Sequence, residues 1–263
     1  MKNTALIICL LILSGINLYS QEDSDKRSGN WTQFIHLESG FVYPAGTIKE
    51  SIAIRQNISS YYVNQTSTGE ISSETYGFNL GLRWEYFNLK YKSGISSGLR
   101  YTGYKSDITG FSSSNADFFY LRYSTINRDT KFARVKNIND VSNYLSIPLE
   151  IRIVPLQYKK LGLFAKAGTE FSRFNLKKKT NLIFQDEDMN VHEDMILSYI
   201  TEPTNKFYST LYASVGLQIG NENKPNFLFE VFLPSYYMSR NNFALIDEDG
   251  FEGFRFSLQF PLN

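Results

Sequence analysis

Eight separate segments of the chain alternate hydrophobic and polar residues with a period of two. In residues 144–153, every odd position from 145 onward is Leu or Ile, whereas the even positions from 146 onward are Ser, Pro, Glu and Arg. Successive side chains of a β-strand point to opposite faces, so this pattern predicts a strand with one apolar and one polar face. The other segments that alternate in this way are residues 32–43, 76–87, 90–104, 161–174, 208–220, 226–233 and 254–262.

The connections between these segments alternate in length. Long connections cover residues 44–75, 105–142, 175–206 and 234–250, and short ones lie near Asn88, at 155–160 and at 221–225. An even number of strands with alternating short turns and long loops is typical of outer-membrane barrels, which place the turns in the periplasm and the loops outside. The chain is therefore predicted to be all-β, an eight-stranded antiparallel up-and-down transmembrane β-barrel over residues 31–263.

Alternation by itself also fits a soluble secreted barrel, in which the apolar face points inward. Two features favour the membrane form. The strands of about 10 to 13 residues are long enough to cross the hydrocarbon region when tilted. The polar face is also rich in small residues, which suit the crowded interior of an eight-stranded barrel. These residues are Gly40, Gly77, Gly81, Gly94, Ser96, Gly98, Gly162, Gly168 and Gly216. Aromatic residues make up 16% of the chain, and Tyr43, Tyr76, Tyr86, Tyr91 and Tyr104 lie near strand ends, as interface girdles require.

The amino terminus has the layout of a secretory signal peptide. Lys2 precedes an apolar run over residues 5–13, small residues follow, and a charged stretch begins after Gln21. This predicts a signal peptide over residues 1–20, cleaved after Ser20, and a polar linker over residues 21–30. The apolar run is too short for a membrane-spanning helix. The single cysteine, Cys9, lies within it, so the mature chain would have neither a disulfide nor a thiolate metal site.

The polar face carries equal numbers of acidic and basic side chains, which would all point into the lumen. Charges in a narrow interior of low polarity must be paired. We therefore expect a structural ion-pair network that occludes the lumen, although a path for protons or small solutes along the same charges is an alternative. Its members would be Glu38, Arg83, Glu85, Arg100, Glu150, Arg152, Lys166, Glu170, Glu230 and Arg255.

No catalytic, cofactor-binding or metal-binding residues are predicted, and the chain is not expected to be an enzyme. His36 falls on the polar face near Glu38 and is expected to be a hydrogen-bonded lumen histidine. His192 lies in residues 185–194, where five carboxylates could hold Ca²⁺, but their spacing matches no calcium loop and charge runs are usually solvated. The net charge of +1 gives no indication of a nucleic-acid partner.

Three short runs resemble the outer-membrane β-barrel (porin-like) family that is common in Bacteroidota. They are Leu-Glu-Ser-Gly-Phe-Val-Tyr-Pro at 37–44, Tyr-Leu-Ser-Ile-Pro-Leu-Glu at 144–150, and Gly-Phe-Arg-Phe-Ser-Leu-Gln-Phe at 253–260. The resemblance implies an outer-membrane location and assembly by the barrel-insertion machinery, which reads an aromatic-rich last strand. Here Phe260 is followed by Pro261, Leu262 and Asn263, so the usual terminal aromatic residue is missing. The family has no shared catalytic residues, and nothing in this sequence singles out its PorT-like branch, which is linked to protein secretion.

These observations predict a structural or surface-interaction barrel with an occluded polar lumen and four long surface loops. Small-solute transport and a secretion-system accessory role are the alternatives. The expected partners are outer-membrane lipid, the barrel-assembly machinery and an extracellular protein or glycan bound by the loops. Lipopolysaccharide is expected near Lys177, Lys178 and Lys179, which follow the fifth strand on its outer side, although a solvated strand end explains these lysines equally well.

Overall fold

Eight antiparallel strands form a closed ring in the computed structural model of the chain. The structure describes residues 31–49, 54–55, 71–110, 118–124, 130–201, 205–220, 224–239 and 243–262. The predicted signal peptide and linker therefore lie outside the described residues. The ring strands are β1 (Trp31–Ile48), β3 (Ile71–Asn88), β4 (Ser93–Gly110), β6 (Thr130–Tyr158), β7 (Leu161–Phe184), β8 (Phe207–Ile219), β9 (Asn226–Tyr237) and β10 (Ile246–Leu262).

Each strand pairs with its neighbour in the sequence, and β1 pairs with β10 to close the ring. The closure runs from Gln33 opposite Leu262 to Ile48 opposite Ile246. The barrel thus has no open edge within this ring, which is the arrangement that leaves no backbone hydrogen-bonding groups exposed at an edge. The predicted fold class, an eight-stranded antiparallel up-and-down barrel, is confirmed, and every predicted strand overlaps one of these eight.

The strands are longer than predicted, mostly at the end with the long connections. At the turn end, β6 also continues through residues 155–158, which were predicted to belong to a short connection. β6 has 29 residues and β7 has 24, against the expected 10 to 13. The prediction that residues 105–142 form a loop is therefore wrong for most of their length. In the predicted loop 175–206, residues 175–184 belong to β7 and 187–200 are helical. The loop prediction is also wrong for 44–48, 71–75, 234–237 and 246–250, which belong to β1, β3, β9 and β10. These segments continue the strands because each finds a partner beyond the barrel wall, for example Ile138 opposite both Ile108 and Leu182.

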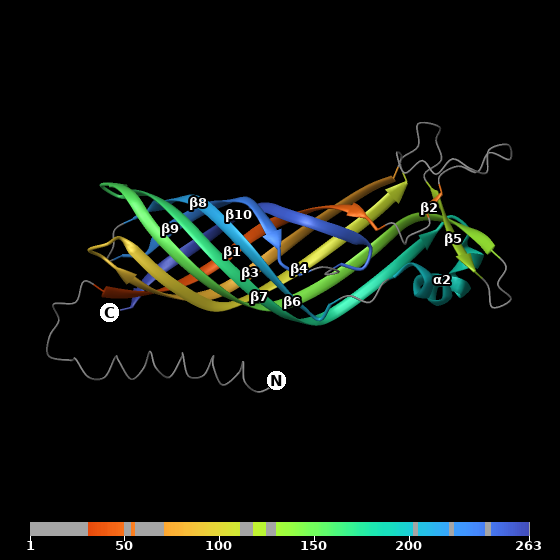
Figure 1. Cartoon of the computed structure of the whole chain (residues 1–263), viewed down its shortest axis with the longest axis horizontal. Coiled ribbons are helices and arrows are strands. Elements are labelled where there is room, and N and C mark those ends of the chain that lie inside the picture. Colours follow the sequence, from red (N-terminus) through yellow and green to blue (C-terminus); the bar gives the residue numbers. More distant parts are fainter. Residues whose placement is uncertain are drawn as a thin grey trace.

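A compact unit, which we call the cap, is built on the outer halves of β6 and β7 (Figure 1). It contains β2 (Ile54–Arg55) and β5 (Phe119–Ser124), which extend the sheet beyond β6, together with the 3₁₀ helix η1 (Glu187–His192) and the helix α2 (Glu193–Ile200). Its interior is apolar and includes Phe119, Leu121, Val135, Ile196 and Ile200, each at most 2% exposed. Among the described residues, no helix combines the length and the hydrophobicity needed to cross a bilayer.

The turns lie at the opposite end of the barrel from the cap (Figure 1). Tyr158 pairs with Leu161 across a two-residue turn between β6 and β7, and Asn88 pairs with Ser93 across a four-residue turn between β3 and β4. The side-chain carbonyl of Asn88 accepts hydrogen bonds from the backbone N–H groups of Lys90 and Tyr91, at 3.0 and 2.9 Å. This Asx turn explains why the chain reverses there.

Candidate functional site

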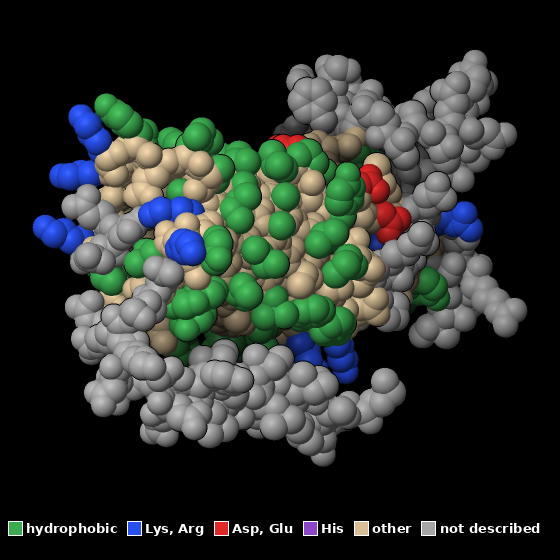
Figure 2. Space-filling model, turned by 60° about the vertical axis from the view of Figure 1, so that its left-hand side comes forward, with side chains coloured by type: hydrophobic (Ala, Val, Ile, Leu, Met, Phe, Trp, Pro, Cys, Tyr) green, Lys and Arg blue, Asp and Glu red, His purple; other side chains and the backbone are tan. Residues whose placement is uncertain are grey.

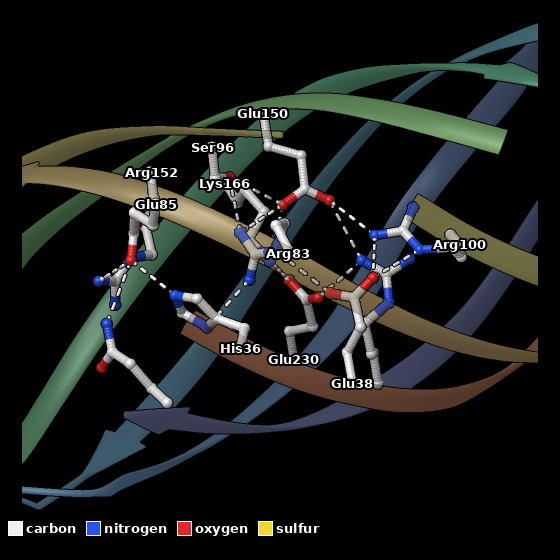
Figure 3. A network of polar contacts seen from close by, with 12 residues as sticks. His36, Glu38, Arg83, Glu85, Ser96, Arg100, Glu150, Arg152, Lys166 and Glu230 are labelled. Atoms are coloured by element: carbon white, nitrogen blue, oxygen red, sulfur yellow. Dashed lines mark hydrogen bonds and ion pairs between the residues drawn. The ribbon is translucent and has the colours of Figure 1, made fainter. Parts of the chain in front are cut away.

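The charged side chains of the polar face all point into the lumen and form one layer across it (Figure 3). Every one of the ten residues named from the sequence lies there, and the most exposed, Glu170, is only 8% exposed. They come from β1, β3, β4, β6, β7, β9 and β10, so the layer ties nearly the whole circumference together. Acidic and basic members are equal in number, which leaves the layer without net charge if all are ionised.

Glu150 on β6 is the centre of the layer. Its carboxylate lies 2.6 Å from Arg83 Nη1, 3.0 Å from Arg100 Nη2, 3.3 Å from Arg255 Nη1 and 3.4 Å from Lys166 Nζ. The Tyr212 hydroxyl donates to the same carboxylate at 2.5 Å. One anion that faces several cations is stable in a buried site because its lone pairs are all used.

Glu38 on β1 and Glu170 on β7 complete the contacts of Arg100. Arg100 Nη2 lies 2.6 Å from Glu38 Oε1, and Arg100 Nη1 donates to Glu170 Oε2. Glu38 also accepts from Arg83 Nε at 3.2 Å, and Glu170 accepts from the Ser146 hydroxyl at 2.5 Å. Arg100 therefore contacts three carboxylates on three different strands.

Glu85, Arg152 and His36 form the part of the layer nearest the turns. Arg152 donates to both oxygens of Glu85, through Nε at 2.7 Å and Nη2 at 2.8 Å, which is the bidentate geometry of a strong charge-assisted pair. His36 Nε2 lies 2.8 Å from Glu85, and His36 Nδ1 lies 3.3 Å from Arg83 Nη2. An arginine can only donate, so Nδ1 accepts and Nε2 carries the hydrogen that Glu85 receives. His36 is thus hydrogen-bonded through both ring nitrogens inside the lumen.

Glu230 on β9 holds the remaining cations. It lies 2.7 Å from Lys166 Nζ and 3.1 Å from Arg255 Nη1, and it accepts from the Ser214 hydroxyl at 2.8 Å. Lys166 and Arg255 also contact Glu150, so each of these cations bridges two carboxylates. The whole layer is a continuous network rather than a set of isolated pairs.

Glycines on the lumen face make room for these large side chains. A Cβ at Gly81 would lie 2.6 Å from the Glu38 carboxylate, and one at Gly168 would lie 2.9 Å from Glu150 Cγ. Any larger residue at either position would displace a carboxylate of the network.

Apolar side chains pack inside the lumen on both sides of the charged layer. The turn-end plug consists of Phe34, Phe87, Val154, Phe164 and Leu228, all at most 6% exposed. The Arg152 guanidinium lies 4.7 Å from the centre of the Phe87 ring, which joins this plug to the charges by a cation–π contact.

Toward the cap, the lumen is filled by rings that pack edge to face. They are Tyr104, Tyr144, Tyr208, Tyr212, Phe232, Tyr237, Phe243 and Phe251. Between these rings and the charged layer lies a cavity of about 20 Å³, bordered by Asn79, Thr102 and Arg255 among others. A space of this size is comparable to one water molecule.

The outer wall of the barrel is apolar. On β3, the side chains from Tyr76 to Tyr86 that face outward are Tyr76, Phe78, Leu80, Leu82, Trp84 and Tyr86, each 36–53% exposed. Figure 2 shows such side chains spread over the wall. Tyr76 and Tyr86 are about 34 Å apart along the strand. With a usual tilt, this matches the apolar band of about 25 Å and the flanking aromatic girdles of a membrane barrel. The turn-side girdle includes Trp31, whose ring stacks on Tyr86 at 4.7 Å between centres.

Several members of the site were not singled out from the sequence. Tyr212, Ser96 and Gln259 bind Glu150, Arg83 and Glu85 respectively. The alternation had placed all three on the polar face, so parity was the signal that could have identified them. Their partners lie on other strands, and the two-residue period of one strand does not predict contacts between strands.

The acidic segment 185–194 has structural roles in the cap. Asp186 receives two hydrogen bonds from Arg134, at 2.9 and 2.6 Å, and Glu193 accepts from the backbone N–H of Leu182 at 2.8 Å. Across the described part of the chain, no group of three or more His, Cys, Asp or Glu side chains is arranged to hold a metal ion. His192 has no part in the lumen layer.

Comparisons with known proteins give similar folds at low sequence identity. Neither a scan of protein-family models nor a search of curated proteins finds a match. Among solved structures, the chain is similar to the outer membrane protein OprG from Pseudomonas aeruginosa, with a TM-score of 0.41, 10% identity, and coverage of 87% of this chain and 96% of that one.

The chain is also similar to the Outer Membrane Protein W of E. coli, with a TM-score of 0.37, 13% identity, and coverage of 89% and 100%. A third similar structure is the translocator domain of the autotransporter NalP from Neisseria meningitidis, with a TM-score of 0.29, 11% identity, and coverage of 97% of each chain. No functional residue is transferred from these proteins, and the class of eight-stranded barrel rests on the strand pairing of this chain itself.

Proposed function

We propose that this protein is an integral barrel of a bacterial outer membrane that does not conduct and that displays its cap on the outer side. The observation that carries the proposal is the inverted distribution of polarity in the barrel wall. Apolar side chains face outward in a band between two aromatic girdles, while the charges are buried inside. A soluble barrel places these two sets the other way round.

The proposal of an occluded lumen is supported by three sets of side chains that follow one another along the barrel interior. They are the turn-end plug, the charged layer and the edge-to-face rings, and the cavity at the junction of the last two measures about 20 Å³. An eight-stranded barrel is just wide enough for side chains to fill. This favours a platform role over small-solute transport or passage of secreted protein through the lumen.

The surface-interaction role is supported by the folded core of the cap. A connection that only linked two strands would need no buried residues, whereas α2 packs Ile196 and Ile200 into the cap interior. The cap also presents Val191 and Tyr199 to solvent, at 87% and 53% exposure. Exposed apolar side chains on a rigid support suit an extracellular protein or glycan partner.

Single-channel conductance of the refolded protein tests the occluded lumen. We expect no stable open level in planar bilayers, and a large, long-lived open state would contradict the proposal. Membrane insertion is tested on the same preparation by gel mobility with and without boiling, where a heat-dependent shift is expected.

Orientation can be tested with single cysteines, because the only cysteine of the chain, Cys9, belongs to the predicted signal peptide. Val191→Cys in the cap and Tyr158→Cys at the turn-side end of β6 replace side chains of similar exposure, 87% and 73%. A membrane-impermeant maleimide should label the cap variant in intact cells and the turn variant only after lysis. Equal labelling of both in intact cells, or the reverse order, would show that the cap is not on the outside.

A further inference from the structure

The described residues of the turns at the turn end carry only positive charges. The turns contribute Lys90 and Lys92 between β3 and β4, Lys159 and Lys160 between β6 and β7, and Lys224 before β9. We call these five residues the lysine collar. Among the residues of these turns that the structure describes, none is Asp or Glu. Figure 2 shows Lys and Arg side chains gathered at this end of the barrel.

The cap end differs, because its charges are of both signs and some of them pair with one another. Lys105 Nζ lies 2.7 Å from Asp107, and Arg134 forms its two bonds with Asp186. The excess of positive charge is therefore a property of the turn end and not of the polar surface in general.

The collar lies directly beside the turn-side aromatic girdle. Tyr91 and Tyr158 are 71% and 73% exposed, and each ring has a lysine over it, with Lys90 Nζ 5.4 Å and Lys159 Nζ 5.3 Å from the ring centres. Tyrosines at such positions lie at the level of lipid headgroups. The ammonium groups held over them are therefore at the depth of the lipid phosphates.

Two collar lysines occupy backbone positions that usually belong to glycine. Lys92 and Lys159 have φ angles of 52° and 53°, in the left-handed region. Tight hairpins normally place Gly or Asn at such positions because a side chain is unfavourable there. A lysine thus occupies a strained backbone position in each of two turns.

We propose that the lysine collar binds the anionic headgroups of phospholipids in the leaflet at the turn end. The hairpins that carry it are distributed around the ring, between β3 and β4, β6 and β7, and β8 and β9. A lipid annulus reaches all three, whereas one protein partner would contact one side. Basic residues at a membrane surface attract anionic lipids over roughly a Debye length. The proposal rests on the membrane insertion proposed above.

The tryptophans of the chain can serve as fluorescent probes for the leaflet at the turn end. Its two tryptophans, Trp31 and Trp84, both face outward in the turn-side half of the wall, at 47% and 38% exposure. Their fluorescence is quenched by adjacent lipids with brominated acyl chains. We would reconstitute the full mature chain in vesicles that contain equal fractions of phosphatidylglycerol and phosphatidylcholine, with only one of the two lipids brominated.

Quenching by brominated phosphatidylglycerol should exceed that by brominated phosphatidylcholine by at least about twofold, because lysines raise the local concentration of anionic lipid. In the variant with Lys90, Lys159, Lys160 and Lys224 changed to Gln, the ratio should fall to about one. The matched control changes Lys131, Lys136, Lys179 and Lys206 to Gln, which removes the same charge from exposed positions of the cap end. The control should keep the wild-type ratio.

A ratio of one in the wild type, or an unchanged ratio in the collar variant, would overturn the proposal and point to a soluble anionic partner or to none. If the collar variant fails to show a heat-dependent gel shift, salt replaces it as the test on the wild type. Raising NaCl from about 0.05 M to about 0.5 M should bring the ratio toward one, since screening shortens the reach of the lysines. A ratio that salt leaves unchanged would also refute lipid binding by the collar. Absence of quenching by either lipid would instead contradict membrane insertion.

Discussion

The two halves of β6 have opposite distributions of polarity. In the barrel wall, Glu150 and Arg152 point inward and are buried, while Ile147, Leu149 and Ile151 point outward. In the cap, Val135 and Ile138 are buried and fully apolar, while the outward side chains include exposed Arg134 and Lys136. One strand thus has polar residues inside and apolar residues outside in its wall half, and the reverse in its cap half.

This difference in polarity indicates that the wall half of β6 faces lipid and that the cap half faces water. Burial away from water lowers the free energy of an apolar side chain. In a membrane barrel this burial occurs on the lipid face, whereas in a water-exposed cap it occurs in the interior. The buried side chains of β6 change from odd to even positions at the irregular pairing with β7 between Val135 and Asn137. Bulges of this kind shift the alternation, so that a continuous strand can serve two environments.

The largest expected effect comes from breaking the centre of the charged layer. Glu150→Gln leaves the shape almost unchanged but removes the anion that four cations share, so the free energy of unfolding should fall by about 3–5 kcal/mol. Denaturant titration of the refolded barrel measures it. The control Glu252→Gln, on an exposed part of β10, should stay within about 0.5 kcal/mol of the wild type. Equal stability of both variants would mean that the layer contributes nothing to the folded state.

The cap core should be nearly as sensitive, but only locally. Ile196→Ala removes a fully buried side chain from α2 and should weaken the cap by about 2–5 kcal/mol. Because the cap core is apolar and separate from the charged layer, we expect faster proteolysis of the cap with an unchanged heat-dependent gel shift. Loss of the shift together with the cap would show that the two regions fold as one unit.

An arginine should have opposite consequences on the two outer surfaces. Leu82→Arg introduces a charge into the apolar band and should lower stability in vesicles by about 2–4 kcal/mol. Val191→Arg, at a still more exposed position of the cap, should change it by at most about 0.5 kcal/mol. Unfolding titrations of both variants in the same lipid provide the comparison, and a tolerated Leu82→Arg would argue that β3 does not face lipid.

The smallest effect is expected for the exposed ion pair of the cap. Arg134 and Asp186 have the same bidentate geometry as Arg152 and Glu85, but both side chains are 43% exposed. Asp186→Asn should therefore cost only about 0.2–1 kcal/mol, since water replaces the lost contact. Glu85→Gln should cost several times more, as expected for a buried pair. A similar loss for both substitutions would contradict the difference in solvation between lumen and cap.

The barrel itself could be predicted from the chain because its two faces differ at every second residue. Parity alone assigned Glu150 and Arg152 to one face and Leu149 and Ile151 to the other, and the lumen layer contains every charged residue assigned in this way. The cap could not be predicted in the same way. Its strands are apolar on the face that is polar in the barrel, and the bulges interrupt the period on which the prediction depends.

The sequence by itself determined the number of strands in the ring, their order and the face of the barrel wall on which each side chain lies, since these follow from the two-residue period and from connection length. Only the tertiary structure decided the partners within the lumen. Glu150, Arg100 and Glu38 lie on three different strands and meet because ring closure and register bring them to the same depth. The tertiary structure also decided that β6 and β7 continue into a cap, because backbone pairing and an apolar core formed by distant segments extend the strands there.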